Sequence, residues 1–199
     1  MEELYASITE GVRKPKHPVA LFLCGAAGTG KTTLRNTFLN DVGITTTFVT
    51  LNVDMIRDRV GDQSTVRTIF HQLTDKAIED GYSLLYDATC RDKTNVVARM
   101  KELHQKGYKL ILGIVYATRK TMLGRIQRRI DQPLDESVAQ DIYSHLSKNV
   151  ETYMSLKELD EVYLYNNEAT AKLIFKKTAK KVYCISPSSA FYFDVSRYC

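Results

Sequence analysis

The feature that most constrains this chain is a glycine-rich stretch at residues 25–32, Gly-Ala-Ala-Gly-Thr-Gly-Lys-Thr, which directly follows the apolar run Val19–Cys24. It fits the pattern G-x-x-x-x-G-K-[ST] of the phosphate-binding P-loop. In such a loop successive backbone N–H groups face inward and hold an anion, and Lys31 would add positive charge for the β- and γ-phosphates. Leu34 and Phe38 follow at the i, i+4 spacing of a helix, whose N-terminal end would face the phosphates. This strand–loop–helix context predicts a site for a nucleoside triphosphate, ATP or another NTP.

The predicted nucleotide side of the site consists of this loop, the threonine after it and an arginine further along the chain. Thr32 would offer its hydroxyl group to Mg²⁺, and Lys31 would stabilise the transferred phosphate. The predicted nucleotide-binding residues are Gly25, Ala26, Ala27, Gly28, Thr29, Gly30, Lys31, Thr32, Thr33 and Arg128.

The rest of the chain predicts the fold. Helical periodicities alternate with runs rich in branched apolar residues, at residues 19–24, 45–53, 82–86, 108–117 and 161–165. This order predicts an α/β fold, a P-loop NTPase three-layer sandwich with a mostly parallel sheet and helices on both faces. Two further short runs predict a C-terminal antiparallel hairpin, at residues 173–177 and 181–185.

Length and charge bound the organisation and the substrate. The 199 residues predict a single domain, spanning residues 1–199. We expect residues 1–17 to be a polar lead-in, in which prolines delay regular structure until the first strand, and we assign no structure to the tail at residues 186–199. The net charge of +5 suits an anionic substrate and is well short of the basicity of a duplex-DNA binder.

The cysteines and the apolar runs bear on location. Cys24, Cys90, Cys184 and Cys199 are widely spaced, with no C-x-x-C pair and no zinc-type spacing. This favours reduced thiols in a cytosolic compartment over disulfides or a metal site. The N-terminus has no signal-peptide pattern, and the longest apolar runs are too short to cross a bilayer. We therefore expect a cytoplasmic chain with no membrane partner.

Asp54 follows the second predicted strand, and Arg57 lies three residues further on. A carboxylate at this position can orient an attacking hydroxyl group or accept its proton, and an arginine one turn away can bind a phosphate or carboxylate of the acceptor. The alternative is an aspartate that caps a helix beside a solvated arginine. The pattern favours neither.

Asp87 follows the third apolar run, within the segment Leu-Leu-Tyr-Asp-Ala-Thr-Cys-Arg of residues 84–91. Its position is similar to that of a Walker-B aspartate, which can hold Mg²⁺ through water. No second carboxylate follows it, as would be usual in ATPases that activate a water molecule, and this favours transfer to a hydroxyl group over hydrolysis. The alternative is an ordinary turn aspartate at the end of a strand.

Arg125, Arg128 and Arg129 have the i, i+3, i+4 spacing that places them on one helix face. Like charges on one face repel unless anions lie between them, so a lid that clamps phosphate groups is one explanation. A solvated basic face is the other.

Together these motifs resemble those of the zeta-toxin and polynucleotide-kinase group of P-loop kinases. The matching pieces are the P-loop, Asp54 with Arg57, the strand end Asp87-Ala-Thr89 and the arginine-bearing segment, in the order in which that group carries them. The resemblance covers roughly residues 17–175.

The resemblance implies a division of the site into catalytic, substrate-binding and metal-binding residues. Asp54 would be the general base, and Arg57 would orient the substrate. The implied catalytic residues are Asp54, Lys31, Arg129 and Arg125, the substrate-binding residues are Arg57, Asp87, Thr89 and Arg91, and the Mg²⁺ ligands are Thr32 and Asp87.

The leading functional hypothesis is an ATP-dependent kinase that phosphorylates a hydroxyl group on a nucleotide sugar, as zeta toxins do with UDP-N-acetylglucosamine. The alternative is a 5′-hydroxyl polynucleotide kinase, which Asp87-Ala-Thr89 and Pro133 after the lid favour. The third hypothesis is a nucleotide-binding switch without transfer activity, against which a candidate base at Asp54 argues. The resemblance leaves an inhibitory protein partner and the oligomeric state open.

Overall fold

The computed structural model describes residues 1–44, 46–60, 63–128, 134–186 and 191–199, and for Val60, Gln63 and Ser64 it describes the backbone alone. None of the helices in these ranges is long and apolar enough to cross a membrane. The strands are β1 (Val19–Cys24), β2 (Val49–Asn52), β3 (Leu84–Ala88), β4 (Lys109–Tyr116), β5 (Glu161–Asn166), β6 (Lys172–Lys177) and β7 (Val182–Cys184). The helices are α1 (Glu2–Thr9), α2 (Lys31–Val42), α3 (Val53–Val60), α4 (Gln63–Glu79), α5 (Lys93–Gln105), α6 (Arg119–Gln127), α7 (Glu136–Met154) and the short 3-10 helix η1 (Val195–Tyr198).

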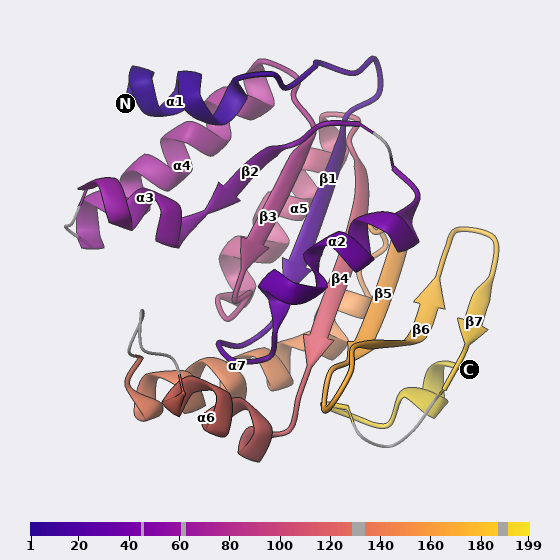
Figure 1. Ribbon diagram of the computed structural model, residues 1–199. Helices are drawn as coiled ribbons and strands as arrows, with labels where there is room; N and C mark the ends of the chain where they lie inside the picture. Colours follow the sequence, from indigo (N-terminus) through magenta and orange to yellow (C-terminus); the bar gives the residue numbers. More distant parts are fainter. Residues whose placement is uncertain (45, 61–62, 129–133, 187–190) are drawn as a thin grey trace.

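The strands form one sheet in the order β2-β3-β1-β4-β5-β6-β7 (Figure 1). β1 to β5 run parallel to one another, whereas β6 and β7 pair antiparallel with their neighbours. The predicted α/β fold with a mostly parallel sheet and a C-terminal antiparallel hairpin is therefore confirmed.

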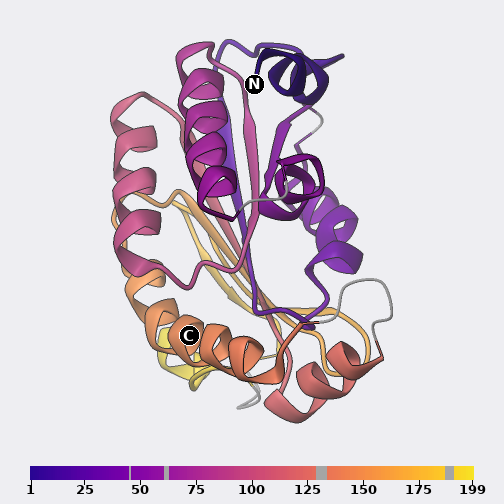
Figure 2. The same ribbon diagram turned by 90° about the vertical axis from the view of Figure 1, so that its left-hand side faces the viewer.

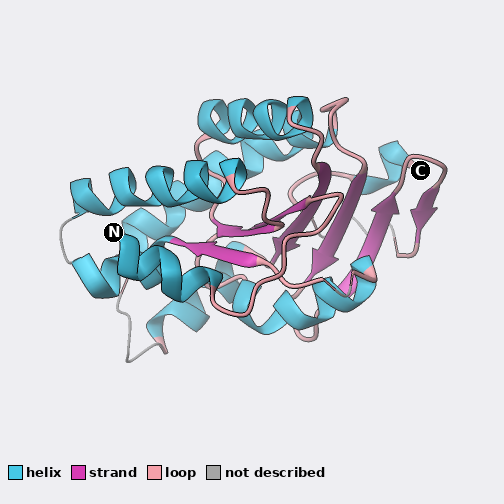
Figure 3. Ribbon diagram, turned by 90° about the horizontal axis from the view of Figure 1, so that it is seen from above, coloured by secondary structure: helices cyan, strands magenta, loops and turns pink. Residues whose placement is uncertain are grey.

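Both faces of the sheet are covered, which explains why the strands read as continuous apolar runs. All six residues of β1 are buried. Ala20 and Phe22 pack in the cluster that contains side chains of α4, α5 and α7, and Leu21 and Leu23 pack with Leu34 of α2. Figures 2 and 3 show these helices on opposite sides of the strands. Alternate residues of β1 thus face the two outer layers of the predicted sandwich.

The carboxyl ends of β1, β2 and β3 meet at one edge of the sheet. Asp87 of β3 pairs in register with Leu23 of β1 and with Asn52 of β2. The P-loop follows β1 directly, and α3 follows β2 directly. This edge, where ligands bind in parallel α/β sheets, therefore brings together segments that are far apart in the sequence.

The N-terminal segment differs from the predicted polar lead-in, because residues 2–9 form α1. Leu4 of this helix is buried in the core, and the Tyr5 hydroxyl donates a hydrogen bond to the carboxylate of Asp80, just after α4. A helix of eight residues carries too few apolar positions to show a clear period, and its packing partner lies far along the chain.

The second predicted strand is shorter than its sequence pattern indicates. β2 ends at Asn52, and Val53 already belongs to α3. The Asn52 side chain accepts a hydrogen bond from the Asp54 amide at 2.7 Å, which caps the first turn of α3 directly at the strand end. No turn separates the strand from the helix. The run of β-branched residues therefore did not show where β2 ends.

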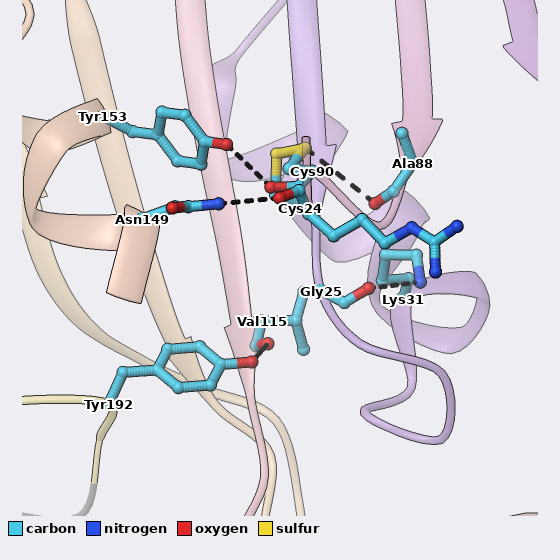
Figure 4. The surroundings of a disulfide bond; sticks show 10 residues. Cys24, Gly25, Lys31, Ala88, Cys90, Val115, Asn149, Tyr153 and Tyr192 are labelled. Atoms are coloured by element: carbon cyan, nitrogen blue, oxygen red, sulfur yellow. Dashed lines mark hydrogen bonds between the residues drawn. A yellow bond between two sulfur atoms is a disulfide. The ribbon is translucent and has the colours of Figure 1, made fainter. Parts of the chain in front are cut away.

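The C-terminal tail, to which no structure could be assigned, packs onto the core. Phe191 is 6 % exposed and Val195 is fully buried. The Tyr192 hydroxyl donates to the carbonyl oxygen of Val115 at 3.4 Å, close to where the P-loop begins (Figure 4). The aromatic residues of this segment therefore serve packing.

The prediction of four reduced thiols is wrong for this structure. Cys24 and Cys90 form a disulfide with a Cα–Cα distance of 5.4 Å, and Cys184 and Cys199 form a second one at 5.9 Å. Wide spacing in the sequence did not mean separation in space. Because β1 and β3 are neighbours, the last residue of β1 lies opposite Ala88, two residues before Cys90.

Candidate functional site

The P-loop connects β1 to α2 with a backbone that requires glycine. Gly28 and Gly30 have φ angles of +79° and +90°, in the left-handed region that residues with a β-carbon rarely adopt. α2 begins at Lys31, and the Leu34 amide donates to the carbonyl oxygen of Gly30 at 3.0 Å. The helix N-terminus therefore opens directly from the loop, as an anion site of this type requires.

Residues of α6 and of the segment after β5 lie close to the backbone of this loop. A β-carbon on Gly28 would lie 2.6 Å from the carbonyl oxygen of Met122 in α6, and one on Gly30 would lie 2.2 Å from Nδ2 of Asn167. The buried Asn167 amide also donates to the carbonyl oxygen of Thr29 at 2.8 Å. The loop backbone is thus held from α6 and from the segment after β5.

Replacing Gly30 with alanine should weaken ATP binding by about tenfold or more, or about 1.4 kcal/mol, because the new methyl group would displace Asn167 and the Thr29 carbonyl it holds. The matched control is Gly43→Ala: Gly43 ends α2 with a φ of +69°, yet a β-carbon there meets nothing within 4 Å. Both variants carry the cost of a left-handed alanine, about 1 kcal/mol. Titration calorimetry with ATP would then isolate the steric effect, and equal affinities in the two variants would contradict it.

Lys31 folds back over the P-loop, and its Nζ donates to the carbonyl oxygen of Gly25 at 2.8 Å (Figure 4). Thr32 and Thr33 lie in the first turn of α2 and are exposed. The side chains that the motif predicts for phosphate and Mg²⁺ therefore lie together at one end of α2.

Asp87 lies at the centre of the sheet edge and is 9 % exposed. Burial raises the pKa of its carboxyl group above the ordinary value, while the positive charges of Lys31 and Arg35 oppose this rise and the negative charge of Asp54 adds to it. Three charged side chains of α2 and α3 therefore act electrostatically on this carboxyl group of β3, at the carboxyl ends of the strands.

Asp54 and Arg57 lie on α3 and pair with each other. The Arg57 guanidinium donates to Oδ1 of Asp54 at 2.7 Å, and the two side chains remain about half exposed, at 46 % and 53 %. An exposed pair of this kind stabilises a fold little. Since Asn52 caps α3, the helix-capping alternative for Asp54 is wrong, and its carboxylate is accessible at the site.

Residues 89–91, which follow β3, form a segment that we call the acceptor-side loop. Thr89 is half-buried, whereas Arg91 is exposed and has its guanidinium 3.7 Å from a carboxylate oxygen of Asp141 in α7. Arg91 also borders an open surface hollow of about 540 Å³. The charged side chains that line it together with Arg91 are Arg67, Lys93, Asp92 and Asp141. Arg91 is thus placed beside a hollow that carries both signs of charge.

Arg125 lies on α6 and donates hydrogen bonds to the P-loop backbone and to the segment after β5. Its guanidinium donates to the carbonyl oxygens of Asn167 and Glu168 at 2.8 and 3.0 Å, and to that of Gly28 at 3.4 Å. These acceptors are all backbone oxygens. In this arrangement Arg125 ties the P-loop to the segment after β5.

The predicted arginine lid is described only in part. α6 ends at Gln127, and Arg128 is its exposed C-terminal cap. Arg129 and Pro133 lie outside the described residues. The two described arginines differ, since Arg125 is engaged with backbone oxygens while Arg128 faces solvent.

Glu168 should make the link between α6 and the end of β5 depend on pH. Its carboxylate accepts hydrogen bonds from the Thr118 amide and, at 2.7 Å, from the Thr121 hydroxyl. Burial acts to raise the pKa of Glu168, but these bonds and the charge of Arg125 outweigh it, so the pKa lies below its ordinary value of 4.5. A carboxyl group whose pKa is lowered on folding stabilises the fold above its unfolded pKa, and this contribution disappears as the pH falls through the folded pKa.

We therefore expect the unfolding temperature of the wild type to fall more steeply than that of Glu168→Gln as the pH is lowered through and below 4.5, the ordinary value. Circular dichroism melts over that range measure this difference. Glu10→Gln, at an exposed position after α1, is the control for loss of a single carboxylate. Parallel pH curves for the wild type and Glu168→Gln would contradict the assignment.

Three residues near the site were not predicted. Arg35 lies one helical turn after Lys31 and donates to the Thr50 hydroxyl at 2.7 Å. Its i, i+4 spacing from Lys31 is a signal that the sequence carried. Asn167 and Tyr192 come from the segment after β5 and from the tail, and no local pattern marks either of them.

The described residues fit a nucleotide with Mg²⁺ at this edge. The P-loop supplies backbone N–H groups and Lys31 supplies a cation for the phosphates. The Thr32 hydroxyl and the Asp87 carboxylate are oxygen donors of the kind that Mg²⁺ prefers. These groups stand at the carboxyl ends of β1 and β3.

Comparisons with known proteins agree with this architecture. The sequence matches the family model of the zeta toxin over residues 2–179. A comparison with curated protein sequences gave no significant match.

A structure from the PezAT chromosomal toxin–antitoxin system of the human pathogen Streptococcus pneumoniae is similar with a TM-score of 0.71 and 20 % identity, over 89 % of this chain and 81 % of that chain. The AvrRxo1-ORF1:AvrRxo1-ORF2 structure with sulphate ions is similar with a TM-score of 0.70 and 12 % identity, over 93 % of this chain and 68 % of that chain.

A third similar structure is from the Pnkp1/Rnl/Hen1 RNA repair complex, with a TM-score of 0.56 and 16 % identity, over 68 % of this chain and 46 % of that chain. At such identities these structures show a shared fold. The family match extends over most of the sequence and includes the P-loop. The chain belongs to the zeta toxin family of P-loop kinases.

Proposed function

We propose that this protein is an ATP-dependent kinase that transfers the γ-phosphate to a hydroxyl group of a nucleotide sugar such as UDP-N-acetylglucosamine. The observation that carries the proposal is the grouping of Lys31, Asp54 and Asp87 at one sheet edge, where the charges of the first two act on the pKa of the third. A cation for the phosphates, an accessible carboxylate and a buried carboxylate are the parts that phosphoryl transfer to a hydroxyl group needs.

Each of these side chains has a separate role in the proposed reaction. Lys31 stabilises the negative charge on the transferred phosphoryl group. Asp54 exchanges its pairing with Arg57 for the acceptor hydroxyl group, orients it and accepts its proton. The Mg²⁺ held by Thr32 and Asp87 would neutralise charge on the phosphate oxygens. A related structure, AvrRxo1-ORF1:-ORF2 with ATP, supports ATP as the donor, at a TM-score of 0.64 and 12 % identity.

Membership of the zeta toxin family favours a small acceptor. In the open hollow beside Arg91, the cationic side chains of Arg91, Arg67 and Lys93 suit the phosphates of a nucleotide sugar, and Asp92 and Asp141 lie beside them. In the proposed complex, Thr89 and Arg91 contact the acceptor and Arg57 orients it.

A 5′-hydroxyl polynucleotide kinase is the second candidate. Its support is the similarity of fold to a structure from the Pnkp1/Rnl/Hen1 RNA repair complex, which is lower than that to the PezAT structure. The strand end Asp87-Ala-Thr89 also fits this class.

The test is incubation with labelled ATP and a panel of UDP-sugars, nucleosides and 5′-hydroxyl oligonucleotides. We expect label on a UDP-sugar. Label on oligonucleotides alone would establish the second candidate instead, and nucleotide binding without any labelled acceptor would favour a switch that lacks transfer activity.

An intracellular location and a protein partner are further parts of the proposal. ATP as the donor favours an intracellular site of action, although cytosolic thiol systems usually keep cysteines reduced, unlike the two disulfides here. The toxin–antitoxin and two-component complexes among the similar structures favour an inhibitory protein partner. Cell fractionation and purification under native conditions would test these two points.

A further inference from the structure

The disulfide between Cys24 and Cys90 joins the strand that carries the P-loop to the acceptor-side loop (Figure 4). Cys24 is the last residue of β1 and directly precedes Gly25. Its backbone is paired on both sides, with Ala88 of β3 and with Ile114 of β4. This end of the crosslink is therefore held by backbone pairing on both sides, at the carboxyl end of an inner strand.

The other end of the crosslink lies in a loop. Cys90 follows β3 without belonging to it, and its φ of +52° is the left-handed conformation, which is found at no other described residue except glycines. Such a backbone is unfavourable for a residue with a β-carbon and persists where the surroundings hold it. The crosslink is one of the interactions that do so.

Helix α7 holds the acceptor-side loop from the opposite direction. The Tyr153 hydroxyl donates to the carbonyl oxygen of Cys90 at 2.7 Å, and Nδ2 of Asn149 donates to that of Arg91 at 2.8 Å (Figure 4). Both of these side chains are buried. With the disulfide in place, the loop is fixed between α7 and β1, and this sets where Thr89 and Arg91 stand.

Building on the kinase function proposed above, we propose that Cys24 and Cys90 are positioning residues, whose disulfide fixes the acceptor-side loop against the P-loop strand and makes phosphotransfer respond to a dithiol reductant. In that reaction the S–S bond breaks, each cysteine sulfur gains one hydrogen from the dithiol, and the dithiol is oxidised to its own disulfide. Because the Cys24 end is held by two strands, reduction leaves the P-loop in place, whereas the acceptor-side loop loses its link to β1 and keeps only its bonds to α7.

The effect is therefore specific to the acceptor. We expect reduction to raise the KM for the acceptor about tenfold, since small misplacements of positioning groups have large effects on transfer. ATP affinity should stay unchanged. A disulfide that only stabilised the fold would not change the acceptor KM while leaving the ATP affinity unchanged.

The second disulfide offers an internal control. Cys184 and Cys199 join β7, at the edge of the sheet, to the C-terminus, and both are exposed. Cys24 and Cys90 are 0 % and 4 % exposed. A dithiol should thus reduce the outer pair first, without effect on transfer, and the inner pair later, with loss of acceptor affinity.

The experiment compares the wild type with two double variants. Cys184→Ala with Cys199→Ala retains the inner disulfide, and Cys24→Ala with Cys90→Ala removes it. Thiol alkylation with mass spectrometry measures the redox state of each cysteine pair. The acceptor KM and the ATP affinity are measured before and after dithiol treatment. We expect the first variant to respond as the wild type does, and the second to have a raised acceptor KM that the dithiol no longer changes.

Three outcomes would overturn the proposal: unlinked Cys24 and Cys90 in untreated protein, an acceptor KM that reduction leaves unchanged, or an equal loss of ATP affinity. If the variant with Cys24→Ala and Cys90→Ala does not fold, the comparison of untreated with reduced wild type still tests the proposal. Hydrogen exchange of the peptide that contains residues 89–91 needs no acceptor, and faster exchange after reduction is expected. If no acceptor is ever labelled, the proposed kinase function fails, while unchanged exchange would refute the positioning role by itself.

Discussion

Replacing Lys31 with alanine should slow phosphotransfer about a thousandfold. The variant lacks the cation that, in the proposed reaction, stabilises charge on the transferred phosphate. A second effect follows from the electrostatics of the site. Because the charge of Lys31 lowers the pKa of Asp87 against the effect of burial, the pKa of Asp87 should rise further in the variant.

Steady-state kinetics and carboxyl-carbon NMR would measure these two effects. Lys106→Ala is the matched control, since Lys106 is exposed at the end of α5, near the start of β4 and thus at the opposite edge of the sheet. It should leave both quantities unchanged. Normal turnover in Lys31→Ala would refute the assignment of the P-loop as the phosphate site.

Replacing Asp54 with asparagine should lower kcat by about 10² to 10⁴ while ATP affinity stays close to that of the wild type. The asparagine side chain cannot accept a proton as a carboxylate does, and it keeps the size of the original residue. Since Asn52 caps α3, the exchange removes no cap and should leave the helix intact.

Asp58→Asn is the matched control for Asp54→Asn. Asp58 is exposed on α3, one turn beyond Asp54, so its exchange removes the same charge from the same helix. Kinetics and ATP titrations of both variants separate the roles. A loss of ATP affinity with Asp54→Asn would place Asp54 among the Mg²⁺-site residues, and an unchanged kcat would remove it from the reaction.

The parts of the fold that were predicted correctly are those with local causes. The run Val19–Cys24 is apolar throughout because both faces of β1 are buried. The hairpin of β6 and β7 likewise follows from two neighbouring β-type runs.

The parts that were missed depend on contacts between distant segments. α1 is stabilised by packing of Leu4 in a core built from later residues. The role of Arg125 in a phosphate clamp stays a prediction, but its bonds to backbone oxygens of the P-loop and of residues after β5 were missed, because no spacing on α6 could indicate them. Arg91 is likewise contacted by Asn149 and Asp141 of α7, far along the chain.

The nucleotide side of this site could be predicted from the sequence, because the P-loop, Lys31 and the start of α2 are contiguous and their geometry follows from local backbone preferences. The groups that surround this loop became visible in the folded structure. The bond from Asn167 to Thr29 spans 138 residues, and the Cys24–Cys90 disulfide spans 66. The strand order places β3 and β4 beside β1 and β5 beside β4, so residues that follow β3 and β5 reach the P-loop or its strand, and local sequence patterns do not reveal that order.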